Sequence, residues 1–153
     1  MPKVFLLLVL LVFGVNGSSS PQPVSGPFDE FGDVNCENEM ARLDNFAIQL
    51  QNWPGAIGHI IFYGGRVFRG RLPKQGEAAE RAARLRLYLV ERRGIPANRV
   101  LVREGGYFDE WRAELWVVPR DVMPPSPSSR AVPASKIKFG KGKVNQRALR
   151  CNI

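Results

Sequence analysis

Apolar and polar positions in the middle of the chain follow patterns that predict a strand, a helix and a second strand. Residues 57–63 form a short apolar run that two glycines end, which favours a buried strand over a helix. Along 76–93 apolar side chains recur on one helical face, and Gly94 is suited to ending the helix in a left-handed turn. A further apolar run at 99–102 completes a βαβ unit. The residues of the helical face are Ala78, Ala82, Leu85 and Leu89.

The segments before this unit predict an edge strand and a second core-facing helix. Residues 28–34 alternate weakly between apolar and polar positions, as an edge strand does. A helix is predicted to begin near Glu39, with Asn38 as its N-cap, and to end at 53–55, where Trp-Pro-Gly breaks the pattern. Its core face carries Met40, Leu43, Ala47 and Leu50.

The segment after the unit predicts one more strand. Gly105 and Gly106 are expected to bend the chain, and residues 111–118 then alternate as a strand that Pro119 closes. One face of this strand would carry Ala113, Leu115 and Val117. The predicted fold class is therefore α+β, a βαβαββ sandwich in which two helices pack on one face of a mixed sheet.

The first 27 residues have the pattern of an export signal followed by a flexible leader. Lys3 precedes an apolar core at 4–15, and small residues offer a cleavage point after Gly17. The apolar core is shorter than a comfortable membrane span, so a retained anchor helix is the less favoured alternative. We assign 1–17 to a signal peptide and 18–27, rich in Ser, Pro and Gly, to the leader. The mature protein is expected to be exported, periplasmic or extracellular, with no stable membrane span.

The residues beyond the predicted domain, which covers 28–119, divide into a linker and a basic tail. Residues 120–135 are rich in proline and serine, which predicts an extended linker with little to pack. Residues 136–153 alternate basic and apolar positions, which fits a basic strand or hairpin, a solvated tail being the alternative. In an oxidising compartment we predict a disulfide between Cys36 and Cys151 that ties the tail to the domain, rather than two buried or reactive thiols.

The net charge of the chain and its few candidate catalytic residues limit the classes of function that it can have. The chain carries 22 Lys and Arg against 14 Asp and Glu, and an exported basic protein can meet anionic polymers, lipid headgroups or acidic proteins, although solubility alone would also explain the charge. No catalytic residue, metal site or cofactor motif is assigned, because His59 is the single histidine and Asp109 with Glu110 is the only acid pair to check. We predict that the protein is not an enzyme, has no cofactor and, being exported, binds no nucleic acid.

Two stretches resemble a known family. Residues 80–89 (Glu-Arg-Ala-Ala-Arg-Leu-Arg-Leu-Tyr-Leu) and 93–100 (Arg-Gly-Ile-Pro-Ala-Asn-Arg-Val) resemble the second helix and following turn of OmpA-like domains, the peptidoglycan-binding modules of bacterial envelopes. The predicted helix at 41–50 and strand at 57–63 fall where that family has its first helix and second strand. The resemblance spans roughly 28–119 and implies the same βαβαββ arrangement of helices on a sheet.

The resemblance also implies a ligand. The family holds the diaminopimelate of a peptidoglycan stem between an aspartate after the second strand and an arginine in the second helix, and Arg81 matches that arginine. The aspartate is missing, because this chain has Tyr63, Gly64 and Gly65 where the family has glycine or a polar residue, then threonine and aspartate. Since that carboxylate would pair with the ammonium group of the ligand, the resemblance implies a retained fold with a changed pocket.

The basic loop at 64–74 gives two hypotheses for function. It gathers Arg66, Arg69 and Arg71 near the expected position of Arg81, which suits an anionic group, a solvated loop being the alternative; Tyr63 either lines the same cleft or packs in the core. The first hypothesis is an exported, non-catalytic envelope module that holds a carboxylate or other anionic group of the cell wall, such as peptidoglycan. The second is a structural or protein-interaction module with a protein partner and a vestigial pocket.

Overall fold

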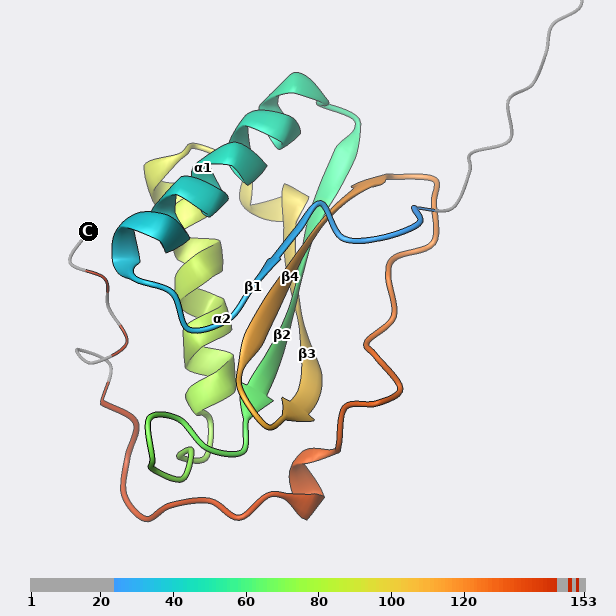
Figure 1. The fold of residues 1–153 in the computed structure, drawn as a ribbon. Coiled ribbons are helices and arrows are strands. Elements are labelled where there is room, and N and C mark those ends of the chain that lie inside the picture. The colour runs from blue at the N-terminus through green and yellow to red at the C-terminus, as the bar shows by residue number, and fades with distance from the viewer. Residues whose placement is uncertain (1–23, 146–148, 150, 152–153) are drawn as a thin grey trace, which may run out of the picture.

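The structure is a computed structural model of the chain, and it describes residues 24–145, 149 and 151. The predicted signal peptide at 1–17 and most of the predicted leader lie outside the described residues. Four strands and two main helices follow one another in the predicted order (Figure 1). They are β1 (Asp29–Phe31), α1 (Cys36–Asn52), β2 (Ala56–Gly65), α2 (Glu77–Leu87), β3 (Val100–Phe108) and β4 (Arg112–Pro119). Short helical turns complete the fold: a π-helix η1 (Tyr88–Arg92), and 3₁₀ turns η2 (Ala97–Arg99) and η3 (Ala134–Lys136).

The four strands form one mixed sheet in the order β1-β4-β2-β3. Strand β2 pairs parallel with β3, and β4 pairs antiparallel with both β2 and β1. Both helices lie on one side of this sheet (Figure 1). The predicted α+β class, the βαβ unit and the covering of one face by two helices are therefore confirmed.

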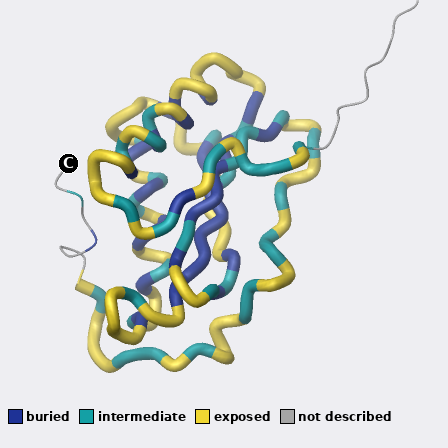
Figure 2. The backbone as a smooth tube through the Cα atoms, viewed as in Figure 1, coloured by how far each residue is buried: buried dark blue, intermediate teal, exposed yellow. Residues whose placement is uncertain are grey.

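The hydrophobic core lies between the helices and the sheet. Leu43, Phe46 and Leu50 of α1 are at most 1% exposed and belong to the same cluster as the core-facing side chains of β2 and β4. Gly58 of β2 permits the closest approach, since a Cβ there would stand 2.8 Å from a Leu50 methyl carbon. Figure 2 shows the buried positions concentrated along the central strands and the inner helix faces. The core is built from the helix and strand faces that the sequence predicts, and it also includes Phe46, which was not predicted.

The first helix begins earlier than the sequence predicts. Asn35 is the N-cap, because its side-chain oxygen accepts a hydrogen bond of 2.9 Å from the backbone N–H of Asn38. Asn38 lies inside the first turn, where its side chain accepts a hydrogen bond of 2.8 Å from Arg42. The prediction of Asn38 as the cap is wrong because both asparagines precede the same apolar run, and only the turn geometry distinguishes them.

The two adjacent glycines of β3 do not bend the chain between strands, as the sequence predicts, but lie inside the strand. The pairing of β3 with β2 shifts by one residue here, opposite Phe62 and Tyr63. A Cβ on Gly105 would stand 2.3 Å from the ring of Tyr63, so the missing side chain makes room for that ring. Gly106 has a φ of 94°, which favours glycine. The pair therefore forms an irregularity within a longer strand.

The segment 120–135 packs against the protein, which differs from the prediction of a linker with little to pack. Figure 1 shows it crossing the side of the sheet that the helices leave open. The backbone of Val132 exchanges two hydrogen bonds of 2.9 Å with Tyr107 at the end of β3. The backbone N–H of Ser128 donates to the hydroxyl of Tyr63 at 3.0 Å. Hydrogen bonds of the backbone hold the segment in place, and amino-acid composition does not predict such bonds.

The tail is tied back to the domain as predicted, but it forms neither a strand nor a hairpin within residues 136–145. Cys36 and Cys151 are joined by a disulfide, which confirms the predicted pairing. Before it, Gly140 makes a single parallel bridge with Lys74, and its N–H donates to the carbonyl of Pro73 at 2.9 Å. Gly140 and Gly142 weaken a strand here, because glycine loses more conformational entropy on ordering and has no side chain to pack, so the tail follows the surface as an extended strap.

Among the described residues, we find no helix with the length and apolar character needed to cross a membrane.

Candidate functional site

Arg81, the candidate ligand-binding residue of α2, is bound to a carboxylate of its own helix. It is 8% exposed, and its guanidinium donates a hydrogen bond of 3.1 Å to Glu77, one turn earlier. Arg71 binds the same carboxylate through two hydrogen bonds of 2.9 and 2.8 Å, and the backbone N–H of Lys74 adds one of 3.1 Å. Glu77 is only 4% exposed, so two guanidinium groups and an amide meet one buried carboxylate.

These contacts set the charges at the cluster. Burial tends to raise the pKa of Glu77, but the hydrogen bonds from Arg71, Lys74 and Arg81 outweigh it and lower the pKa to about 2. Burial lowers the pKa of Arg81, while Glu77 acts in the opposite direction. The cluster therefore holds an ionised carboxylate at neutral pH, and the charge of Arg81 is already paired.

Aromatic rings enclose the rest of the Arg81 guanidinium. Its central carbon lies 4.4 Å from the centre of the Phe68 ring and 5.4 Å from that of Trp111, which are cation–π distances. The cavity beside it, which Tyr107 also lines, measures about 10 Å³. That space holds about one water molecule and no larger ligand.

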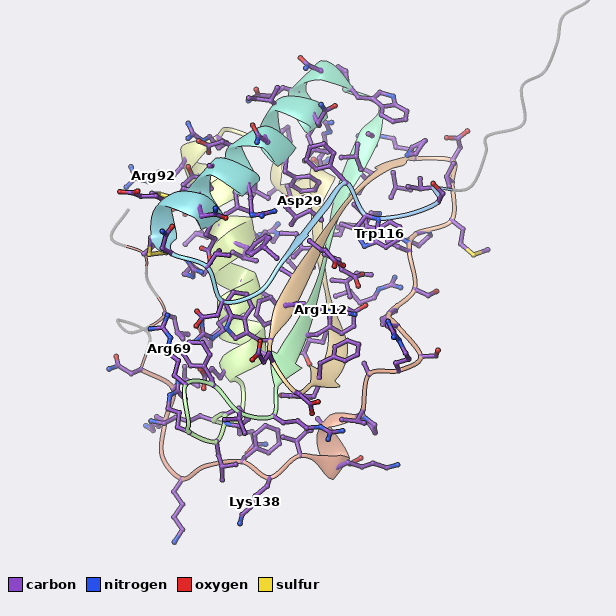
Figure 3. The ribbon with its side chains drawn as sticks, viewed as in Figure 1. Asp29, Arg69, Arg92, Arg112, Trp116 and Lys138 are labelled. Atoms are coloured by element: carbon purple, nitrogen blue, oxygen red, sulfur yellow. A yellow bond between two sulfur atoms is a disulfide. The ribbon has the colours of Figure 1, made fainter. Side chains whose placement is uncertain are left out.

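The basic loop distributes its arginines to three different carboxylates. Arg66 lies 3.5 Å from Asp109, Arg69 makes hydrogen bonds of 3.0 and 3.1 Å to Asp33, and Arg71 binds Glu77. The loop reverses at Arg69 and Gly70, whose φ values of 47° and 78° are in the left-handed region. The side chains of Arg66 and Arg69 are 50% and 70% exposed, and Figure 3 shows Arg69 at the outer side of the loop. The side chain of Arg71 is 43% exposed, although it is bound to Glu77. Arg66, Arg69 and Arg71 are therefore the accessible candidate residues, whereas Tyr63 and Arg81 are buried.

An open cleft lies between this loop and the turn that joins β3 to β4. Its volume is about 730 Å³, and Phe68 and Trp111 are among its lining residues, as they are for the small cavity beside Arg81. The indole Nε1–H of Trp111 is buried and has no hydrogen-bond partner among the described residues. A buried donor without a partner is unusual, and Trp111 lines both the open cleft and the small cavity beside Arg81. The charged residues around the cleft are Arg66, Arg69, Asp33, Asp109 and Glu110.

Tyr63, the remaining candidate, is separated from this cleft. It is fully buried, and its hydroxyl donates to Glu114 at 3.2 Å and accepts the backbone N–H of Ser128. Burial raises the pKa of the Tyr63 phenol, and Glu114 acts in the same direction. Tyr63 therefore anchors the segment 120–135 to the sheet, while Tyr107 lines the cavity beside Arg81.

Sequence reasoning did not identify three residues of this region, namely Glu77, Asp33 and Trp111. Glu77 stands four residues before Arg81, and this helical spacing was a usable signal for an ion pair. Asp33 and Trp111 reach the loop through tertiary structure, for which one sequence offers no local signal. Within residues 24–145, 149 and 151, no group of three His, Cys, Asp or Glu side chains is placed to hold a metal ion.

A scan against protein-family models finds no match for this chain, and a search of the curated proteins finds no similar sequence.

Proposed function

We propose that this chain is an exported, non-catalytic binding module of the cell envelope, with an OmpA-like fold, whose ligand site is the open cleft. The order of strands and helices is the one that the resemblance at 80–100 implies, which supports the assignment of fold family. The disulfide between Cys36 and Cys151 supports an oxidising location. The resemblance to a peptidoglycan-binding family favours the cell wall as the envelope component that this chain binds.

The open cleft carries this proposal. It is of a size that accommodates a small polar group, whereas the cavity beside Arg81 is not. The indole N–H of Trp111 is buried and has no partner among the described residues. In this proposal the cleft wall shifts on binding, so that a carbonyl or carboxylate oxygen of the ligand accepts this N–H. The site therefore has space, two aromatic residues in its lining and a donor that lacks a partner.

The charges around the cleft define the chemistry of the ligand. Arg66 pairs with Asp109 and Arg69 with Asp33, and Glu110 also lines the cleft. Both signs of charge are therefore present, and a purely anionic ligand would meet repulsion. A group that carries both a carboxylate and an ammonium, as the peptide stems of peptidoglycan do, fits this arrangement better. In this proposal Arg81 holds the aromatic wall through its contacts with Phe68 and Trp111, and it does not touch the ligand.

A sedimentation assay with purified cell-wall sacculi tests this function. The chain from Ser18 onward would be compared with the double variant Arg66→Ser/Arg69→Ser and with the matched control Arg92→Ser/Arg120→Ser, which removes two exposed arginines that do not line the cleft. We expect the first variant to lose at least about tenfold in affinity, since two ligand contacts are removed, and the control to bind as the parent does. Equal losses in the two variants would show that only net charge matters and would refute the cleft.

One observation favours a second function, a protein-interaction module with a vestigial pocket. Glu77 occupies the guanidinium groups of Arg71 and Arg81, so the pocket that the resemblance implies is filled by the protein itself. If sacculi retain neither the parent chain nor the variants, affinity capture from an envelope extract should retrieve a protein partner. Failure to retrieve one, for a chain that stays monomeric, would refute this second function.

A further inference from the structure

Positive charge is segregated toward the C-terminus of the chain. Asp121 is the last acidic residue, and seven Lys and Arg follow it between 122 and 153. The described part before it, 24–121, carries 14 Lys and Arg against 14 Asp and Glu, so it has no net charge. The basic character of the protein after its predicted signal peptide thus resides in the last quarter of the sequence.

The lysines of the segment 136–143, which we call the basic strap, differ from the arginines of the domain in their surroundings. Many arginines of the domain pair with carboxylates, as at Glu39, Asp44 and Glu77. No ion pair within the described part of the chain involves a strap lysine, and all four are exposed. They are Lys136, Lys138, Lys141 and Lys143.

The basic strap is held against the domain at several points. The N–H of Gly140 donates to Pro73, and the ammonium of Lys74 donates to the carbonyl of Lys143 at 2.6 Å. The ring of Phe139 packs edge-on against Tyr107, with 5.8 Å between the ring centres. The disulfide fixes the chain after the strap. The four cations are therefore presented on an ordered surface, which lowers the entropic cost of binding.

An exposed apolar side chain, that of Leu72, lies beside the strap. Leu72 and Val67, in the loop that the strap follows, are 36% and 47% exposed. A Cβ on Gly140 would stand 3.5 Å from the Cβ of Leu72, which places the strap directly beside that leucine. Figure 3 shows Lys138 directed outward at this end of the molecule, and Figure 2 shows exposed and intermediate positions along the strap.

We propose that the basic strap, together with Leu72, is a docking surface for an anionic phospholipid bilayer. Lysines attract the phosphate headgroups, and exposed apolar side chains beside them gain from contact with the acyl boundary. A soluble polyanion would satisfy the lysines but would leave Leu72 in water. The combination of the two features therefore favours a membrane surface, at the end of the molecule opposite to Arg92 (Figure 3).

Vesicle co-sedimentation tests this proposal. The chain from Ser18 onward, with its disulfide formed, would be mixed with vesicles of phosphatidylglycerol and phosphatidylcholine, or of phosphatidylcholine alone. This chain keeps every residue that the structure describes and omits the apolar stretch at 4–15, which would itself bind lipid. We expect binding to the anionic vesicles only, and weaker binding as salt is raised.

Two variants separate the contributions. Lys138→Gln/Lys141→Gln should bind about 25-fold more weakly, about fivefold for each lysine, whereas the charge-matched control Arg92→Gln/Arg120→Gln should bind as the parent does. Leu72→Ser should weaken vesicle binding, also at high salt, and should leave binding to soluble polyphosphate unchanged. All five positions are exposed, so these changes spare the core.

The outcomes distinguish a membrane from other partners. Equal binding to neutral and anionic vesicles, equal loss in the two double variants, or no effect of Leu72→Ser on vesicle binding would overturn the proposal. The last result combined with tight polyphosphate binding would assign the strap to soluble polyanions. The cleft variant Arg66→Ser/Arg69→Ser should lose sacculus binding but should bind vesicles at least as tightly as Leu72→Ser does. Failure of one proposal therefore does not imply failure of the other.

Discussion

Replacing Glu77 by glutamine tests the structural role of the Arg71–Glu77–Arg81 cluster. Glutamine keeps the size and the acceptor oxygen of the side chain but removes the charge that two guanidinium groups share. The buried Arg81 would then lack its carboxylate partner, and an unpaired buried charge is costly. We expect a folded but clearly less stable protein.

The magnitude follows from the pKa of Glu77. The folded value of about 2 lies below the ordinary value of 4.5, and this difference corresponds to about 3 kcal/mol of stabilisation by the ionised group. A group with a lowered folded pKa stabilises the protein above its unfolded pKa, and this contribution is lost as the pH falls toward the folded pKa. The contribution of Glu77 should therefore be complete at neutral pH and should disappear between pH 4.5 and 2.

Urea unfolding of the parent and of Glu77→Gln, at a series of pH values, measures this contribution. The difference in the free energy of unfolding should be about 3 kcal/mol at neutral pH and should approach zero near pH 2. Asp33→Asn is a control, because its partner Arg69 is exposed and the loss should be far smaller. A difference below about 1 kcal/mol at neutral pH, or one that stays constant as the pH is lowered, would refute the reasoning.

Three further predictions follow from contacts in the fold. Removing the disulfide with Cys36→Ser/Cys151→Ser should lower the free energy of unfolding by about 2–5 kcal/mol, because the bridge closes a long loop; an unchanged urea midpoint would contradict this. Tyr63→Phe should accelerate hydrogen exchange at the Ser128 amide, whose acceptor is lost, and equal exchange in the two proteins would argue against an anchored segment. Asn35→Ala should cost about 1 kcal/mol in thermal unfolding by removing the cap of α1, and no loss would contradict the capping geometry.

The sequence was sufficient for the elements that local periodicity determines. The apolar run at 57–63, the helical face ending at Gly94 and the alternation at 111–118 all correspond to elements of the structure. The exact cap of α1 and the role of Gly105 could not be predicted, because they depend on one hydrogen bond and on the position of the Tyr63 ring. The composition of 120–135 predicted a linker with little to pack, whereas hydrogen bonds to Tyr63 and Tyr107 hold this segment against the domain.

The candidate site was predicted only in part. The sequence located the basic loop beside Arg81, and Arg71 does meet it through Glu77. The partners of the arginines were not predictable, because ion pairs such as that between Arg69 and Asp33 join residues far apart in the chain. Trp111 lines the open cleft because the turn after β3 brings it to the loop, and the sequence gives no local signal for this contact.

The central claim is that the cleft, and not Arg81, contacts the ligand. Nuclear magnetic resonance of the ¹⁵N-labelled chain, titrated with a soluble peptide fragment of the cell wall, observes both groups in one experiment. The account predicts a saturable shift of the Trp111 indole N–H signal, because this donor gains a partner, with no change in the Arg81 Nε–H signal. A shift at Arg81 without one at Trp111, or no shift at either, would contradict it.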